Sequence, residues 1–132
     1  MRLALEFRHG TPEQLDEIEA ALFALARQTA EQWKLGLSIE ALAPIEPAVL
    51  DTRVVTAIEK AADALNLSHT QLMSLAGHDK QNMSRFTPSA MFFVHSVDGL
   101  SHNPHEFTRA QDVINGANVL LHTLLELCQS MS

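Results

Sequence analysis

The sequence predicts an α/β fold, because segments with the two-residue period of a strand alternate along the chain with segments that have the spacing of a helix. Leu3, Leu5 and Phe7 alternate with other residues over positions 2–9, a pattern typical of a half-buried strand. The same alternation returns over positions 37–43. No internal repeat interrupts this order, so a layered domain is the architecture to expect.

A long helix is expected between these two strands. Thr11 and Gln14 have the spacing of a capping box, and Pro12 occupies the first helical position. Gly36 is the residue expected to end the helix in a left-handed conformation. Pro44 ends the second strand, because proline has no N–H to donate to a sheet. The apolar face of the helix is formed by Leu15, Ile18, Leu22, Leu25 and Ala26.

A change of substructure is predicted at positions 44–50, where two prolines occur within seven residues. Asp51 is expected to cap the next helix, which should run to about Asn66. Two more strands are expected at 71–75 and 90–95, of which the second is the more apolar. The apolar face of the helix after Asp51 is formed by Val54, Ile58, Ala61, Ala62 and Leu65.

The chain should continue with a short helix after His78 and end in a long helix. Thr108 and Gln111 repeat the capping-box spacing before the last apolar periodic segment. The apolar face expected to pack on the core consists of Val113, Ala117, Leu120, Leu121, Leu124, Leu125 and Cys128.

Composition excludes several classes of partner. Sixteen acidic and nine basic residues give the 132-residue chain a net charge of -7, so a nucleic-acid partner is not expected. Apolar runs are far shorter than the roughly 18 residues that span a bilayer, and the N-terminal residues do not have the pattern of a signal peptide. Cys128 is the sole cysteine, which precludes an internal disulfide and favours a cytoplasmic location.

Histidines are concentrated in one part of the chain and raise the question of a metal site. Five of the seven lie between positions 69 and 105: His69, His78, His95, His102 and His105. Their spacing does not place three or four donors together, as zinc sites require, and there is no pair of cysteines. A small histidine-cluster metal binder therefore stays open as one alternative.

Three motifs in one order carry a more specific signal. They are Ala76-Gly77-His78-Asp79, the segment 86–94 (FTPSAMFFV) and the segment 99–106 (GLSHNPHE). Together they resemble the family of N-carbamoyl-L-amino-acid hydrolases, allantoate amidohydrolases and β-alanine synthases, relatives of the aminoacylase and carboxypeptidase-type zinc peptidases. Glu6-Phe7-Arg8-His9 also resembles a strand end of that family. The resemblance covers essentially the whole chain and is strongest over 72–125.

The resemblance implies two substructures within the α/β chain. Residues 1–47 would be half of a ferredoxin-like dimerisation or lid domain. Residues 48–132 would be the C-terminal part of an aminopeptidase-like catalytic domain. Strands of the family's sheets that have no match in this chain would leave the matching strands with unpaired edges. A homo-oligomer, most simply a dimer, is therefore expected.

The resemblance also implies a site. His102 matches a ligand of the family's zinc or manganese ions, and Ala76, Gly77 and His78 match a substrate-binding edge. Lys80 departs from the family, which has a small residue there, as does Leu75 at a position where the family usually has glycine.

No segment matches the family's remaining metal ligands or its general base, so no catalytic residue is assigned. Hydrolysis of the family type needs both a metal and a base. The chain alone is therefore expected to be inactive, to hold no metal tightly and to bind a small-molecule substrate only in a complete site. It would be a split hydrolase that needs a chain carrying the N-terminal half, or a non-catalytic oligomerisation or interaction module.

Overall fold

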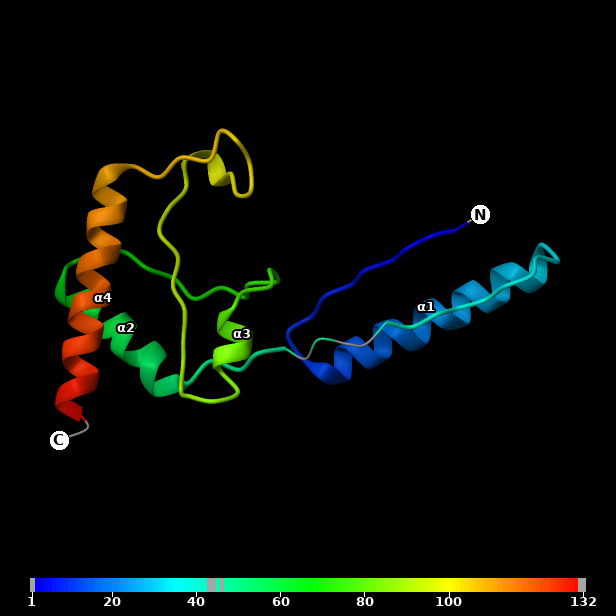
Figure 1. Ribbon diagram of the computed structural model, residues 1–132, viewed down its shortest axis with the longest axis horizontal. Helices are drawn as coiled ribbons and strands as arrows, with labels where there is room; N and C mark the ends of the chain where they lie inside the picture. The colour runs from blue at the N-terminus through cyan, green and yellow to red at the C-terminus, as the bar shows by residue number, and fades with distance from the viewer. Residues whose placement is uncertain (1, 43–44, 46, 131–132) are drawn as a thin grey trace. The chain divides into compact units, whose positions relative to one another are not determined.

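The computed structural model describes residues 2–42, 45 and 47–130. Its elements are α1 (Pro12–Gln32), α2 (Thr52–Ala64), α3 (Lys80–Met83), a 3-10 helix η1 (Val97–Gly99) and α4 (Ala110–Ser130) (Figure 1). They belong to two compact units. The first unit comprises Met1–Ala48 and Met73–Gly77, and the second comprises Val49–Leu72 and His78–Ser132.

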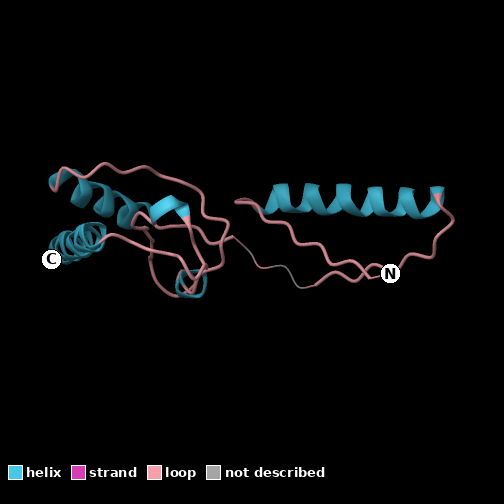
Figure 2. Ribbon diagram, turned by 90° about the horizontal axis from the view of Figure 1, so that it is seen from above, coloured by secondary structure: helices cyan, strands magenta, loops and turns pink. Residues whose placement is uncertain are grey.

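The predicted strands do not form in the described part of the chain. Residues 2–9, 37–42, 71–75 and 90–95 run as loop or extended chain, and Figure 2 accordingly shows helices and loops alone in the described ranges. An extended segment becomes a strand only when its N–H and C=O groups pair with a neighbouring segment, and these segments have no such ladder. The α/β prediction is therefore confirmed in its helices and is wrong in its strands, within the described residues. Position 43 of the second predicted strand lies outside them.

In the first unit, α1 is the predicted long helix, although its two ends differ from expectation. Thr11 is the N-cap residue, but its side chain makes no capping hydrogen bond. At the other end the left-handed residue is Lys34, with φ 52°, and not Gly36. The Leu35 N–H then donates to the Ala30 carbonyl at 2.8 Å, which satisfies an end carbonyl as in a Schellman motif.

The second unit is built around contact between α2 and α4. Ala61 and Ala62 of α2 are buried against Val119 of α4, as their spacing in the sequence predicted for α2. Small side chains on both helices allow a close approach, and Gly116 and Thr123 of α4 are buried as well. Apolar residues that are partly buried complete this core: Ile58, Leu65, Leu67 and Phe92.

The last helix forms as predicted, but a different face is buried. It begins at Ala110, two residues after the predicted cap Thr108. Its buried residues are Gly116, Val119 and Thr123, whereas Leu120 and Leu124 of the predicted face are about half exposed, at 49% and 52%. The predicted face thus stays mostly in solvent in the described structure.

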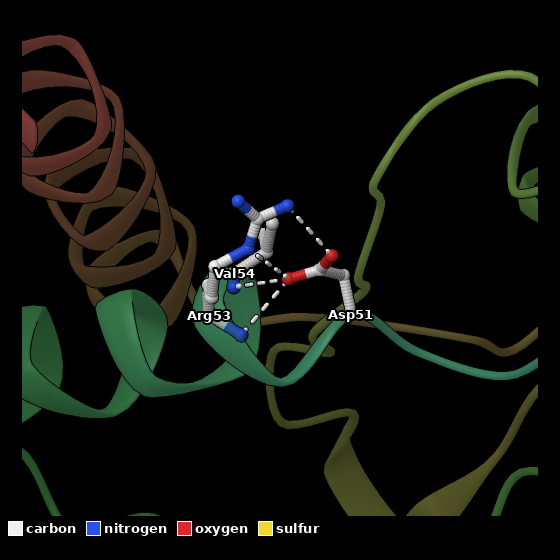
Figure 3. A network of polar contacts seen from close by, with 3 residues as sticks. All are labelled: Asp51, Arg53 and Val54. Atoms are coloured by element: carbon white, nitrogen blue, oxygen red, sulfur yellow. Dashed lines mark hydrogen bonds and ion pairs between the residues drawn. The ribbon is translucent and has the colours of Figure 1, made fainter. Parts of the chain in front are cut away.

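The N-terminus of α2 is fixed by its capping residue (Figure 3). One carboxylate oxygen of Asp51 accepts the N–H groups of Arg53 and Val54, at 2.9 and 3.4 Å. The Arg53 guanidinium also donates to this carboxylate, at 3.1 and 3.3 Å. The hydrogen bond from the Arg53 side chain is the main cause that holds the pKa of Asp51 below its ordinary value of 3.8. The predicted cap is confirmed.

No helix in the described ranges is long and apolar enough to cross a membrane.

Gly116→Ala should destabilise the second unit. A Cβ at this position would collide with Cγ1 of Val94 and approach the Phe92 ring at 3.7 Å. Overpacking costs about 1–3 kcal/mol, and alanine regains about 1 kcal/mol of helix propensity, so the free energy of unfolding should fall by up to about 2 kcal/mol in urea titrations.

Gly36→Ala is the control for this substitution, since a Cβ there meets no atom within 4 Å. Val94→Ala should restore stability to the Gly116→Ala variant by making room for the methyl group. An undiminished stability of Gly116→Ala alone would show that α4 does not pack on residue 94.

The stability of α2 should depend on pH through Asp51. Because the pKa of Asp51 is lowered in the folded state, its contribution is present above the ordinary value of 3.8 and is lost as the pH falls below it through the folded-state pKa. Asp51→Asn keeps a capping oxygen that does not titrate. Urea midpoints should therefore fall more between pH 6 and pH 3 for the wild type than for Asp51→Asn, and equal falls would contradict the role of this ion pair.

Candidate functional site

The loop that carries His102 is shaped by short hydrogen bonds within the loop. The His102 N–H donates to Oε2 of Glu106 at 2.7 Å. Oδ1 of Asn103 accepts the N–H of His105 at 2.9 Å, and the Asn103 carbonyl accepts the N–H of Glu106 at the same distance. The Ser96 hydroxyl donates to the Leu100 carbonyl at 2.6 Å and closes the preceding turn. The loop conformation is therefore determined locally.

His102 has a backbone conformation that side chains rarely adopt. Its φ is 55°, in the left-handed region, which is uncommon for residues other than glycine. Such strain is often found at functional sites, where the surrounding hydrogen bonds hold it in place. The bond from His102 to Glu106 is the contact that offsets it here. The imidazole is exposed, so it is accessible to a ligand.

The described residues do not by themselves fit a metal ion. No group of three or more His, Cys, Asp or Glu side chains in the described ranges is arranged to hold one. His69 lies 3.0 Å from a carboxylate oxygen of Asp63, and His95 lies 4.0 Å from Asp112, so these histidines form pairs with acids. Zinc requires three or four protein donors. The histidines that are crowded in the sequence are thus not gathered into one cluster here.

The predicted substrate edge is divided between the two units. Ala76 and Gly77 are exposed and belong to the first unit, and His78 belongs to the second. Within the first unit, Nη1 of Arg8 donates to the Leu75 carbonyl at 2.7 Å, which fixes the chain just before Ala76. Arg8 also pairs with Glu6. Arg8 therefore makes structural contacts within the first unit.

His78 packs against an aromatic ring in the second unit. Its ring centroid lies 5.5 Å from that of Phe93, with the planes tilted by 55°. Nε2 of His78 is shielded from solvent and has no hydrogen-bond partner among the described residues. No hydrogen bond or ring contact among the described residues joins His78 to His102. The Asp79 side chain, at the N-cap position of α3, makes no capping bond.

Two polar residues of the second unit were not identified from the sequence as parts of a site. Nζ of Lys80 donates to the Val49 carbonyl at 3.3 Å, and burial lowers the pKa of this ammonium. The Ser89 hydroxyl is shielded from solvent without a partner among the described residues, while its carbonyl accepts the Asp51 N–H at 3.0 Å. Lys80 was visible as a departure from the family pattern. Ser89 and Phe93 lie in the motif 86–94, but the motif gave neither side chain a role, because their surroundings depend on tertiary packing.

Comparison with known proteins agrees with the three motifs. Residues 3–126 match peptidase family M20/M25/M40. The chain is 34% identical over 125 residues to an N-carbamoyl-L-amino-acid amidohydrolase of Rhizobium meliloti, covering 95% of this chain and 30% of that protein. It is 41% identical over 81 residues to a ureidoglycolate hydrolase of Arabidopsis thaliana, covering 61% of this chain and 17% of that protein.

A solved structure is similar over most of the chain. It is an amidase of the hydantoinase/carbamoylase family from Burkholderia multivorans, with 33% identity, a TM-score of 0.84 and coverage of 89% of this chain and 29% of that one. The chain thus spans less than a third of the length of each of these proteins.

Glu106→Ala should loosen the loop around His102, because it removes the acceptor of the His102 N–H. Amide hydrogen exchange at His102 should become several-fold faster, because the N–H loses its acceptor and the left-handed backbone loses the hydrogen bond that holds it. Glu106→Gln keeps an oxygen acceptor and is the matched control. Equal exchange at His102 in the wild type and in Glu106→Ala would show that the bond does not hold the loop.

Proposed function

We propose that the chain, which belongs to peptidase family M20/M25/M40, is the C-terminal part of a metal-dependent amidohydrolase. The substrates proposed are N-carbamoyl or ureido compounds of the amino-acid type. The observation that carries the proposal is the similarity in sequence and structure to amidases of the carbamoylase family over nearly the whole chain. The resemblance inferred from the three motifs is confirmed by these matches.

In this proposal the chain contributes one metal ligand and one edge of the substrate pocket. His102 is the ligand for zinc or manganese, and its exposed imidazole on a locally fixed loop supports that role. Ala76, Gly77 and His78 form the substrate edge. No group of three or more His, Cys, Asp or Glu in the described ranges is arranged to hold a metal ion, and the proposal assigns the remaining ligands and the base to a partner chain. No catalytic step is assigned to a residue of this chain.

The proposal includes a division into domains. Residues 1–47 would belong to a ferredoxin-like lid domain and residues 48–132 to an aminopeptidase-like catalytic domain. The extended segments 2–9 and 37–42 would become strands once neighbouring strands supply their backbone partners. A cytoplasmic location is part of the proposal, since the sole cysteine precludes an internal disulfide.

A second candidate is a non-catalytic oligomerisation module. It is supported by the unpaired extended segments of the first unit, where Leu3 and Leu5 are 69% and 68% exposed. Extended edges with apolar side chains recruit other strands. The partner would be a second copy, in a two-fold dimer whose strands or helices replace the missing neighbours.

The two candidates differ in an activity assay. The chain alone, with added zinc or manganese, should not hydrolyse N-carbamoyl-L-amino acids. Mixing it with the part of the Rhizobium meliloti amidohydrolase that precedes the matched region should produce turnover, because the proposal assigns the other ligands and the base to that part. His102→Ala should abolish this turnover, whereas His69→Ala, whose ring is paired with Asp63, should retain it.

If the chain alone shows turnover, and His102→Ala abolishes it, the chain by itself forms a complete site. An inactive mixture of folded parts, together with a stable homodimer of the chain in light scattering, would favour the oligomerisation module.

A further inference from the structure

Large apolar side chains cover a second face of α4, apart from the one that packs on α2. The α2-facing side includes the buried residues Gly116, Val119 and Thr123. A helix at a protein surface has one apolar face, so a helix with two is expected to be covered on both. The second face, called the leucine face below, is about half exposed and consists of Val113, Ile114, Leu120, Leu121, Leu124 and Leu125.

The charged residues of α4 lie outside the leucine face. Glu126 pairs with Lys60 of α2 at 3.0 Å, and Asp112 lies 4.0 Å from His95. A continuous apolar surface of this kind marks a contact with another protein surface. Most of the other polar residues of the helix form one strip beside the leucine face: Gln111, Asn115, Asn118, His122 and Gln129.

An extended segment that packs on α4 has no strand beside it. Residues 92–94 lie against the helix, because a Cβ at Gly116 would meet Cγ1 of Val94 and the Phe92 ring. The surrounding segment, 90–95, is extended but forms no ladder among the described residues. Its N–H and C=O groups can therefore pair with a strand from another protein segment.

We propose that the leucine face and segment 90–95 together form the docking surface for the part of a carbamoylase-type amidohydrolase that precedes the region matched by this chain. This inference rests on the proposed function and identifies where its partner binds. The partner supplies an apolar sheet, whose edge strand pairs with residues 90–95 and whose face packs on the leucine face. One partner thus covers the apolar side chains and satisfies the free backbone groups.

The extent of the matches favours this occupant. The family match, over residues 3–126, includes the whole leucine face. The described conformation corresponds, at a TM-score of 0.84, to 29% of the Burkholderia multivorans amidase, so most of that protein lies outside the matched part. A second copy of this chain is less suitable, because two chains with a net charge of -7 repel each other and a contact between two α4 helices leaves segment 90–95 unpaired.

The test co-expresses the full chain with the part of the Rhizobium meliloti amidohydrolase that precedes the matched region. The dissociation constant of the purified complex is measured by sedimentation velocity. Leu120→Ser combined with Leu124→Ser should weaken the complex at least about ten-fold, because two side chains that leave water on binding are replaced by polar ones.

Asn118→Ser combined with His122→Ser is the matched control. It places the same serines at the same spacing on the polar strip, and it should change the dissociation constant less than about two-fold. Circular dichroism of each variant alone should match that of the wild type, because all four replaced side chains are exposed.

A second measurement needs no substitution. Amide hydrogen exchange of residues 90–95 in the wild-type chain should slow at least about ten-fold in the complex, because pairing with a strand gives these N–H groups acceptors.

The possible outcomes separate this inference from the proposed function. Equal affinity of the leucine variant and the control, or unchanged exchange at 90–95 in the complex, would overturn the docking surface and leave the proposed function intact. Absence of a complex with the wild-type chain would overturn both. A homodimer of the chain alone that the leucine substitutions dissociate would show that a second copy occupies the face instead.

Discussion

Every backbone N–H and C=O group of the chain needs a hydrogen-bond partner, and this requirement separates the ordered elements from the rest. The helices α1, α2 and α4 find these partners within their own segments. An extended segment cannot do so, because its partners lie on a neighbouring strand. Residues 2–9 and 37–42 have the alternation of strands but no ladder among the described residues. Side-chain bonds, such as that from Arg8 to the Leu75 carbonyl, replace sheet pairing in part.

The packing of the second unit also depends on the helices, which satisfy their own backbone groups. α2 and α4 meet where small residues permit a close approach, with Ala61 and Ala62 on one side and Gly116 and Val119 on the other. The bulkier apolar face of α4 is turned away from this contact and remains about half exposed. In an architecture with layers on both faces of a sheet, such a helix face is a surface for further packing. The candidate site residues His78 and His102 are not part of this core; His78 contacts the Phe93 ring, and His102 is held by Glu106.

Local features could be predicted from the sequence, and features that depend on distant segments could not. Helical spacing predicted α1, α2 and α4, and Asp51 was recognised as a cap because capping involves the next three residues. The left-handed end of α1 fell on Lys34, since the helix ended two residues earlier than the glycine implied. The buried face of α4 was not predicted, because the leucines give the stronger apolar periodicity. The contact with α2 instead requires small residues such as Gly116. The surroundings of Lys80 depend on Val49, which is distant in sequence and gives no periodic signal.

The separation of α2 from α4 in the sequence has a consequence for the timing of folding during synthesis. Ala61 is buried against Val119, which the ribosome adds 58 positions later. At about 5–20 residues per second, α2 leaves the ribosome roughly 3–12 s before the residues that cover it. Isolated helices of this length are only marginally stable in water, so α2 depends on packing that is not yet present during this interval. The side chains of α2 that pack on Val119 are therefore exposed to solvent until α4 has been synthesised.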